Sequence, residues 1–263
     1  MRNYVNIILI IVINYSFASD QVPAPEQKHP ILLTNCTIHP VSSEDIRGGS
    51  ILFEKGIITG VARRIANLPE NTEIIDLKGK HVYPGLIAAA SVIGLTEIGA
   101  VAVTRDFSER GEVNPNVRAE VAYNPDSEII PVTRSNGITL AHSCPTGGII
   151  SGTSAIMMLD GWTWEKATLK APAGLHINWP NMGTVRFRRY RVSEEDAAKR
   201  REETLKKLDS AFDEARRYLL AQQADTGSGI IQHNKDLRWE AMVPVLKKEV
   251  PVFMHAGEIR QII

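Results

Sequence analysis

The sequence has little of what marks the specialised classes of protein. It contains two cysteines in 263 residues, which excludes the dense disulfide framework of small secreted domains. Thirty basic and thirty acidic side chains cancel, so no net charge attracts nucleic acid or an anionic membrane. Aromatic residues make up 6% of the chain and hydrophobic residues 43%. This composition is typical of a globular protein and argues against disorder.

The apolar run at the N-terminus is too short to span a membrane. Val5 to Ile13 is apolar except for Asn6, and a spanning helix needs ~20 such residues. Arg2 precedes the run, and small residues ending at Ala18 follow it, which is the pattern of a signal peptide over residues 1–18. We therefore expect an exported protein, periplasmic or secreted, with no membrane span.

The two cysteines, Cys36 and Cys144, fall in what we interpret as different domains. A disulfide requires their Cα atoms to approach within ~7 Å. Two free, buried thiols are therefore the preferred interpretation, although export to an oxidising compartment leaves pairing open.

The composition and the pattern of apolar runs divide the chain into a linker, a β-rich module and a longer α/β part. Residues 19–29 are polar and hold Pro23 and Pro25, which favours a linker. Residues 30–83 contain short apolar runs separated by glycine-marked turns and are expected to form the N-terminal β-sandwich portion. The expected strands are Ile31–Leu33, Ser50–Phe53, Ile57–Thr59 and Glu73–Leu77.

In residues 84–263, apolar runs alternate with longer polar stretches, which is typical of α/β folds with buried parallel strands. Strands are expected at Gly137–Ala141, Thr153–Leu159 and Val250–His255. A helix is expected from Ser193, a favourable N-cap followed by three acidic residues, to about Gln223. The apolar face of this helix is predicted to comprise Leu205, Leu208, Phe212, Ala215, Leu219 and Leu220.

The segment that joins the two parts carries a family resemblance. Gly79-Lys80-His81-Val82-Tyr83-Pro84-Gly85-Leu86-Ile87 resembles the entry to an amidohydrolase barrel. Further motifs in the same order resemble the imidazolonepropionase-like branch, and together the resemblance covers roughly residues 31–263. These motifs lie at residues 94–98, 114–115, 124–128, 130–134, 145–148, 151–152 and 160–163.

The resemblance implies a fold, a cofactor and a substrate class. The fold is α/β, an incomplete (β/α)8 TIM-type barrel over residues 84–263 behind the small β-sandwich portion. The cofactor is Zn²⁺ or another divalent metal, which activates a water molecule. The substrate is a small molecule with an amide or lactam-type bond. Members of this family usually bind metal through His-x-His on the first strand, Lys or Glu on the fourth, His on the fifth and sixth, and Asp on the eighth.

The sequence departs from this pattern in two ways. The first-strand histidine positions are occupied by Ala90 and Val92, and there is no histidine between His81 and His142. From Pro84 to the last residue there are about 180 residues, whereas an eight-stranded barrel takes ~250. We expect a fragment, or alternatively a subunit completed by a second chain or by a homo-oligomer.

His255 is the leading candidate for a metal ligand. It ends the β-rich run Val250–His255 and matches the fifth-strand histidine of the family. The alternative is a core histidine satisfied by a backbone group. His142, at the end of another strand, is interpreted as a packing or capping residue. His176 and His233 are interpreted as exposed loop histidines.

Three other patterns allow a functional and a structural interpretation. An acidic set follows the first strand and is interpreted as ordinary surface charge rather than substitute ligands: Glu97, Asp106, Glu109 and Glu128. Gly147 to Gly152 lacks the Lys-Ser/Thr ending of a phosphate loop and is interpreted as a tight βα connection. Asn124 to Glu128 is expected to start a helix, with Asp126 or Ser127 as its cap.

Arg186 to Arg191 mixes arginines with aromatic residues, as in proteins that bind nucleic acid. The zero net charge of the chain and its expected export argue against a nucleic-acid partner, so none is expected. Two functions stay open. One is an amidohydrolase-like hydrolase of non-peptide carbon–nitrogen bonds, inactive as this chain alone. The other is a catalytically inactive exported binding or scaffold protein of the same fold, or a non-functional fragment.

Overall fold

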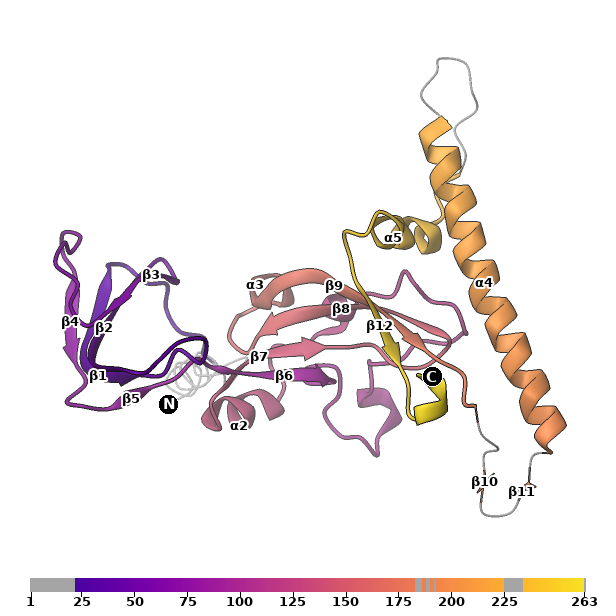
Figure 1. Ribbon diagram of the computed structural model, residues 1–263, viewed down its shortest axis with the longest axis horizontal. Coiled ribbons are helices and arrows are strands. Elements are labelled where there is room, and N and C mark those ends of the chain that lie inside the picture. The colour runs from indigo at the N-terminus through magenta and orange to yellow at the C-terminus, as the bar shows by residue number, and fades with distance from the viewer. Residues whose placement is uncertain (1–21, 183–185, 188–189, 192, 225–233, 263) are drawn as a thin grey trace, which may run out of the picture. The chain divides into compact units, whose positions relative to one another are not determined.

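The computed structural model describes residues 22–182, 186–187, 190–191, 193–224 and 234–262. These residues form two units, one over Pro23–Leu86 and one from Ile87 onward (Figure 1). The expected signal peptide, residues 1–18, and His233 lie outside the described residues. So do Arg188 and Arg189 of the arginine-rich segment, whose described ends form the antiparallel pair β10 (Arg186–Phe187) and β11 (Tyr190–Arg191).

The smaller unit is built on one sheet with β1 at its centre. Strand β2 pairs antiparallel with β1 on one side, whereas β4 and then β5 pair with β1 in parallel on the other. Buried Cys36, Ile38 and Ile51 form its core. The four strands expected from the sequence are all present. The strands are β1 (Ile31–Ile38), β2 (Ile46–Glu54), β3 (Ile57–Ala62), β4 (Glu73–Asp76) and β5 (His81–Val82).

The larger unit contains the sheet that carries the candidate site. Its strand order is β12-β9-β8-β7-β6, which puts β12 and β6 at the two edges of the described sheet. Strand β8 is the central strand, and the second half of β9 is buried on both faces. The strands are β6 (Leu86–Ser91), β7 (Ile138–Ser143), β8 (Ile150–Met158), β9 (Thr168–Asn178) and β12 (Val252–His255).

The expectation of parallel strands is wrong for the middle of this sheet. Strand β7 pairs antiparallel with β8, and β8 pairs antiparallel with β9. The physical reason is the length of the connections, because a parallel pair needs a crossover of a dozen or more residues. Only residues 144–149 separate β7 from β8, which suits a hairpin. Strand β12 does pair in parallel with β9, and a long helical connection separates them.

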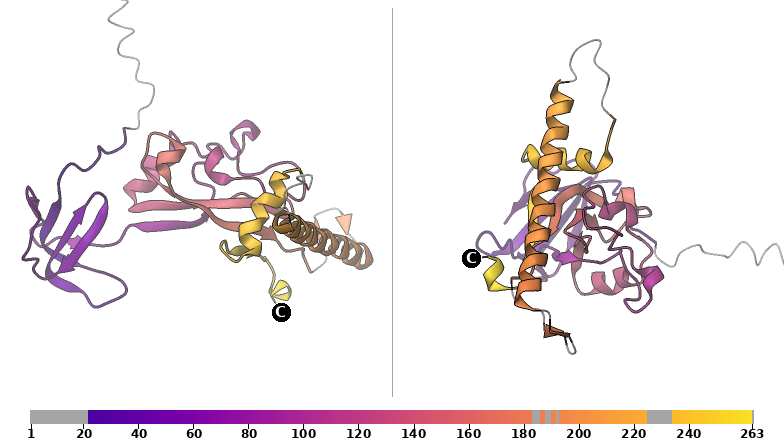
Figure 2. Two further views of the ribbon diagram at one scale, coloured as in Figure 1. Left: turned by 90° about the horizontal axis from the view of Figure 1, so that it is seen from above. Right: turned by 90° about the vertical axis from the view of Figure 1, so that its right-hand side faces the viewer.

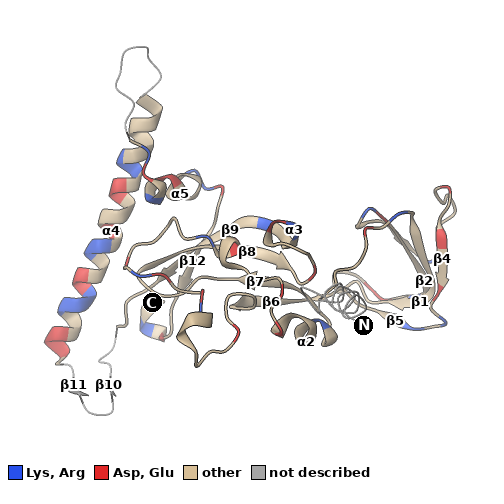
Figure 3. Cartoon of the chain, turned by 180° about the vertical axis from the view of Figure 1, so that it is seen from behind, with Lys and Arg blue, Asp and Glu red and all other residues tan. Residues whose placement is uncertain are grey.

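Helix α4 (Glu194–Ala224) confirms the longest helix expected from the sequence. Ser193 Oγ accepts a hydrogen bond from the backbone N–H of Asp196 at 3.0 Å, as an N-cap does. Segments with Lys and Arg residues alternate with segments of Asp and Glu residues along the helix (Figure 3). The described ion pairs within the helix join residues three or four apart, such as Glu202 with Lys206.

The buried face of α4 differs in part from the predicted one. Leu208 and Ala215 are buried as expected, but Leu220 is 64% exposed. Ala211 and Tyr218 are buried instead, so the contact stripe repeats at three and four residues. This stripe packs with α5 (Leu237–Leu246) against the ends of β8 and β9 (Figure 2).

Short elements complete the larger unit, and in the described residues no helix is long and apolar enough to cross a membrane. A second buried cluster, which includes Ala141, Ala155 and Met157, joins β7 and β8 to α2 and α3. The short elements are η1 (Ala102–Thr104), η2 (Ala119–Ala122), α2 (Ile129–Ser135), α3 (Trp164–Ala167) and η3 (Ile259–Gln261).

Candidate metal centre

Three buried side chains bring nitrogen and sulfur donors together inside the larger unit. His142 is in β7, Cys144 follows it directly after the strand, and His176 is in β9. One donor atom from each residue lies within 4.8 Å of the donor atoms of the other two. We call these three residues the interior donor cluster. Among the described residues, this is the group of three metal-binding side chains whose donor atoms all come this close to one another.

The interpretation of His176 as an exposed loop histidine is wrong. His176 is fully buried in β9, between buried Leu175 and Ile177. Neighbouring residues of a strand point to opposite faces, so burial of all three means that both faces of β9 are covered. The continuous apolar run around His176 was the sequence signal for such a strand. His142, in contrast, is packed inside the unit, as the sequence favoured.

One buried nitrogen atom of the interior donor cluster has no hydrogen-bond partner among the described residues. His142 Nε2 lies 2.7 Å from Ser154 Oγ, and the Cys144 thiol donates to the His142 carbonyl oxygen at 3.3 Å. His176 Nδ1 lies 2.7 Å from His255 Nε2. The other ring nitrogen, His176 Nε2, is buried without a hydrogen-bond partner among the described residues. Such an orphaned atom in a buried site calls for an explanation, and a bound cation is one.

An aromatic ring covers the cluster. Phe253 of β12 stacks on the His176 ring with centroids 5.1 Å apart, and its centroid lies 5.2 Å from that of His142. Gly174 makes this approach possible, because a Cβ atom there would lie 2.3 Å from the Phe253 ring. The glycine is required here for space, since the Phe253 ring occupies the place of a side chain.

Burial decides the protonation of the cluster. Together with smaller effects of the nearby His255 and His142, it lowers the pKa of His176 to about 4. Burial also lowers the pKa of His142, with a smaller effect from His255. The same cause raises the pKa of the Cys144 thiol to about 12. At neutral pH both imidazoles are therefore uncharged, with a lone pair free to bind a cation, and the thiol keeps its proton.

His255, the leading sequence candidate, lies at the end of β12 and beside the cluster. In the parallel register of β12 and β9 it pairs with Asn178, and its ring stacks on His176 with centroids 5.0 Å apart. The side chain is exposed within this chain. Ala90, the next-to-last residue of β6, has a positive φ of 48° and is also exposed. Neither Ala90 nor Val92 offers a donor atom.

The acidic set is not gathered into one site. Glu97 accepts hydrogen bonds from Asn124 Nδ2 at 3.1 Å and Ser127 Oγ at 2.9 Å, and so fixes the loop before α2. Asp106 and Glu109 are exposed and line a groove of about 520 Å³. Glu128 is exposed as well. This arrangement agrees with the interpretation of these residues as surface charge.

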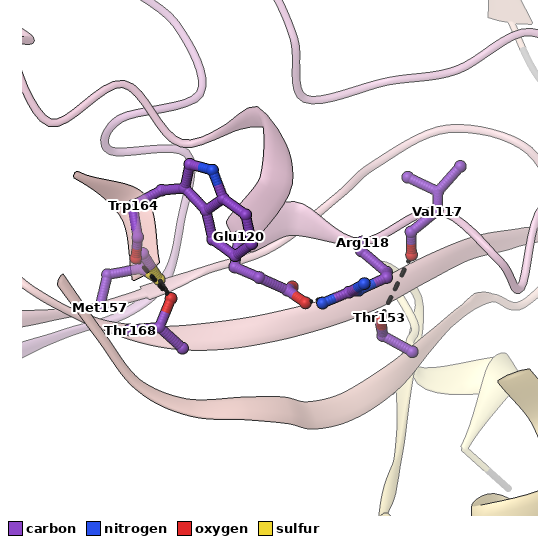
Figure 4. A network of polar contacts seen from close by, with 7 residues as sticks. All are labelled: Val117, Arg118, Glu120, Thr153, Met157, Trp164 and Thr168. Atoms are coloured by element: carbon purple, nitrogen blue, oxygen red, sulfur yellow. Dashed lines mark hydrogen bonds and ion pairs between the residues drawn. The ribbon is translucent and has the colours of Figure 1, made fainter. Parts of the chain in front are cut away.

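One wall of the same groove holds a partly buried ion pair (Figure 4). Arg118 Nε donates to Glu120 Oε1 at 2.7 Å, and the Glu120 side chain is 2% exposed. The hydroxyl of Thr153 donates to the Val117 carbonyl oxygen at 3.2 Å and joins this loop to β8. Thr153 therefore fastens the loop to the sheet, whereas the ion pair lies within the loop itself.

The glycine-rich segment and the segment from Asn124 to Glu128 shape the backbone of the described chain. Gly147 and Gly148 have φ of 87° and 64°, but the turn joins the antiparallel β7 and β8, so the expected βα connection is wrong. Asn178 Nδ2 donates to the Gly148 carbonyl oxygen at 2.9 Å. Helix α2 begins at Ile129, whose backbone N–H donates to Ser127 Oγ at 3.4 Å. The N-cap position is Glu128, which makes no side-chain capping bond, so the expectation of Asp126 or Ser127 as the cap is wrong.

The cysteines behave as expected. Cys36 and Cys144 are free and buried, and they belong to different units. Cys36 donates to the Gly49 carbonyl oxygen at 3.3 Å and is far in sequence from any of the donors described above. It therefore provides a matched comparison for Cys144.

No family model and no curated protein matches the sequence. The solved structures do provide a match. The crystal structure of an amidohydrolase from Thermotoga maritima MSB8 is similar over 88% of this chain and 59% of its own, with 26% identity and a TM-score of 0.73. The chain is therefore similar to an amidohydrolase over most of its length. It spans less than two thirds of the Thermotoga protein, so the amidohydrolase fold is matched in part.

A crystal structure described as a prolidase from Bifidobacterium longum is similar over 27% of this chain and 18% of its own, with 29% identity. Its TM-score of 0.23 is too low to bear on the fold.

The donor set of this chain suits a divalent metal, but it does not include the first-strand positions. Ala90 and Val92 offer no donors, whereas His142, Cys144 and His176 offer two imidazoles and a thiol. Imidazole and thiolate are the donors that zinc and similar ions prefer. The orphaned His176 Nε2 is the observation that favours a bound cation over simple packing.

Proposed function

We propose that the chain forms the front part of a metal-dependent hydrolase that acts on non-peptide carbon–nitrogen bonds in small amides or lactams. The observation that carries the proposal is the fold match to the Thermotoga amidohydrolase over 88% of the chain. In the complete protein, an (β/α)8 barrel would place its metal at the C-terminal ends of the strands.

The position of His255 supports this proposal. His255 is the last residue of β12, at the C-terminal end of a strand that pairs in parallel with β9. Its side chain is exposed within this chain and is therefore accessible to donors from another segment. A divalent ion held there would polarise a substrate carbonyl and lower the pKa of a bound water molecule. His176 would hold the His255 ring through their 2.7 Å contact.

The edges of the sheet support an incomplete barrel. Strand β12 pairs with β9 on one side and lies at the edge of the described sheet, with the side chains from Val252 to His255 exposed. Exposed apolar edge strands are normally covered or paired. We propose that a following segment or a second chain supplies that cover and the missing ligands.

The test compares this chain with a longer product of the same gene. Both are assayed with Zn²⁺, Co²⁺ and Mn²⁺ against a panel of N-acyl amino acids and lactams, with His255→Ala as the control variant. We expect turnover by the longer product, strong loss in the variant and no turnover by this chain alone. Metal-dependent turnover by this chain, or an unaffected variant, would contradict the proposal.

A second function rests on Ala90 and Val92. Because they remove the donors of the first strand, a non-catalytic exported binding or scaffold protein is the alternative. A longer product that is folded and inactive on every substrate would favour it. Export itself is proposed from residues 1–18, and it is tested by cell fractionation of the tagged chain with and without those residues.

A further inference from the structure

We propose that His142, Cys144 and His176 form a buried binding site for a thiophilic divalent cation such as zinc. This site adjoins the proposed hydrolase centre through the contact of His176 with His255, but His255 is not one of its ligands. It uses two residues, His142 and Cys144, that lie outside the usual ligand positions of the family, and it requires neither His255 nor a complete barrel. Its failure and the failure of the hydrolase proposal are therefore distinguishable.

The sheet geometry explains how these donors meet. His142 and Cys144 are two residues apart, so an extended chain directs both side chains to one face. His176 comes from β9, which is separated from β7 by β8. Strands two apart lie ~9.6 Å from each other, and long side chains can close that gap over a small residue. Ser154 of β8 is that residue, and the rings of His142 and His176 approach to 5.6 Å between centroids.

The second observation is the orphaned nitrogen of His176. The residue is fully buried, its Nδ1 is taken by His255, and its Nε2 has no partner in the described part of the chain. A neutral imidazole has one N–H and one lone pair, and burial of either without a partner is unfavourable. A cation bound by the cluster would satisfy this atom.

The donor chemistry selects the class of cation. Two imidazoles and one thiol suit Zn²⁺, Co²⁺ and Cd²⁺ and do not suit Mg²⁺ or Ca²⁺, which prefer oxygen. Tetrahedral zinc bonds of about 2.0–2.3 Å place donors roughly 3.5 Å apart. The donor atoms lie within 4.8 Å of one another in the structure. Side-chain rotations that move each donor atom by about 1 Å would therefore bring them to the distances of a tetrahedral zinc site.

Binding follows a balanced exchange. The Cys144 thiol, which now donates to the His142 carbonyl oxygen, loses its proton to solvent and its thiolate binds the cation. The two neutral imidazoles contribute lone pairs and release no proton. A dication bound to one thiolate leaves a net single positive charge in the site, and the fourth coordination position is open to water.

The test uses Co²⁺ as a spectroscopic probe on chain 19–263. A thiolate bound to cobalt gives a near-ultraviolet charge-transfer band, and tetrahedral cobalt gives visible bands. We expect both to saturate at one equivalent, to disappear when Zn²⁺ is added and to persist in His255→Ala. The chain has two cysteines, so a band that persists in Cys36→Ser is assigned to Cys144 even if Cys144→Ser fails to fold.

Two further variants sharpen the result. Cys144→Ser is expected to lose the charge-transfer band, and His142→Gln to weaken cobalt binding at least tenfold, with far-ultraviolet circular dichroism as the folding control. Absence of the band in the wild-type chain, or its loss in Cys36→Ser, would overturn the proposal. Loss of the band in His255→Ala would show that the cation belongs to the proposed hydrolase centre instead.

Discussion

His176 Nδ1 and His255 Nε2 lie 2.7 Å apart, one on β9 and the other on β12. The two residues are separated by 79 positions in sequence, and the parallel pairing of their strands brings them together. One of the two rings must donate a proton to the other, so a neutral pair has complementary tautomers. This contact connects the buried cluster with the exposed end of the sheet.

The first prediction concerns this contact. Burial is the main cause that lowers the pKa of His176 to about 4, and among its neighbours His255 contributes more to this lowering than His142. Replacement of His255 by alanine should therefore raise the pKa of His176, because a like charge is removed. The pKa is measured from the imidazole proton shifts in a nuclear magnetic resonance titration. An unchanged or lower value would contradict the assigned role of His255.

The second prediction is a loss of stability in acid. The unfolded chain binds a proton at His176 near pH 6.5, whereas the folded chain binds it only near pH 4. Stability should thus decrease as the pH falls through this window, by on the order of 3 kcal/mol. Urea unfolding at pH 7.5 and pH 4.5 measures the decrease.

His176→Phe is the control for that experiment. The variant removes the titrating group while it keeps a buried ring, so its stability should depend less on pH over the same window. An equal decrease in the variant and in the wild-type chain would assign the effect to other groups.

The third prediction concerns the space that Gly174 leaves for Phe253. An alanine Cβ there would lie 2.3 Å from the ring, so the ring must move off His176. We expect Gly174→Ala to destabilise the chain by about 1–3 kcal/mol, as overpacking does. Gly99→Ala is the matched control, since a Cβ at Gly99 meets no atom within 4 Å. Equal unfolding midpoints for the two variants would refute this account.

The fourth prediction separates two leucines of α4. Leu208 is 6% exposed and packs in the core with α5, whereas Leu220 is 64% exposed. Leu208→Ala should lower the free energy of unfolding by about 2–5 kcal/mol. Leu220→Ala should change it by no more than about 0.5 kcal/mol. Thermal or urea unfolding of the pair tests the observed face of the helix against the face predicted from sequence.

The sequence by itself determined the local structure where the physical signal is local. The N-cap at Ser193 and the helical period determined α4, and turns at Lys55-Gly56 and Lys78-Gly79 determined where the first strands end. The barrel-entry segment and its following motifs were sufficient to indicate the amidohydrolase family. Each of these signals depends on neighbouring residues only, through backbone conformation or hydrophobic periodicity.

The tertiary structure alone decided which residues meet. His176 had no sequence neighbour that marks it as a ligand. Its donor cluster forms because the antiparallel pairing of β7, β8 and β9 places His142 and His176 on either side of the small Ser154. Leu220 fits the helical period yet faces solvent, since α5 covers a stripe displaced toward Ala211 and Tyr218. Strand pairing and helix packing join residues distant in sequence, and local propensity carries no information about such contacts.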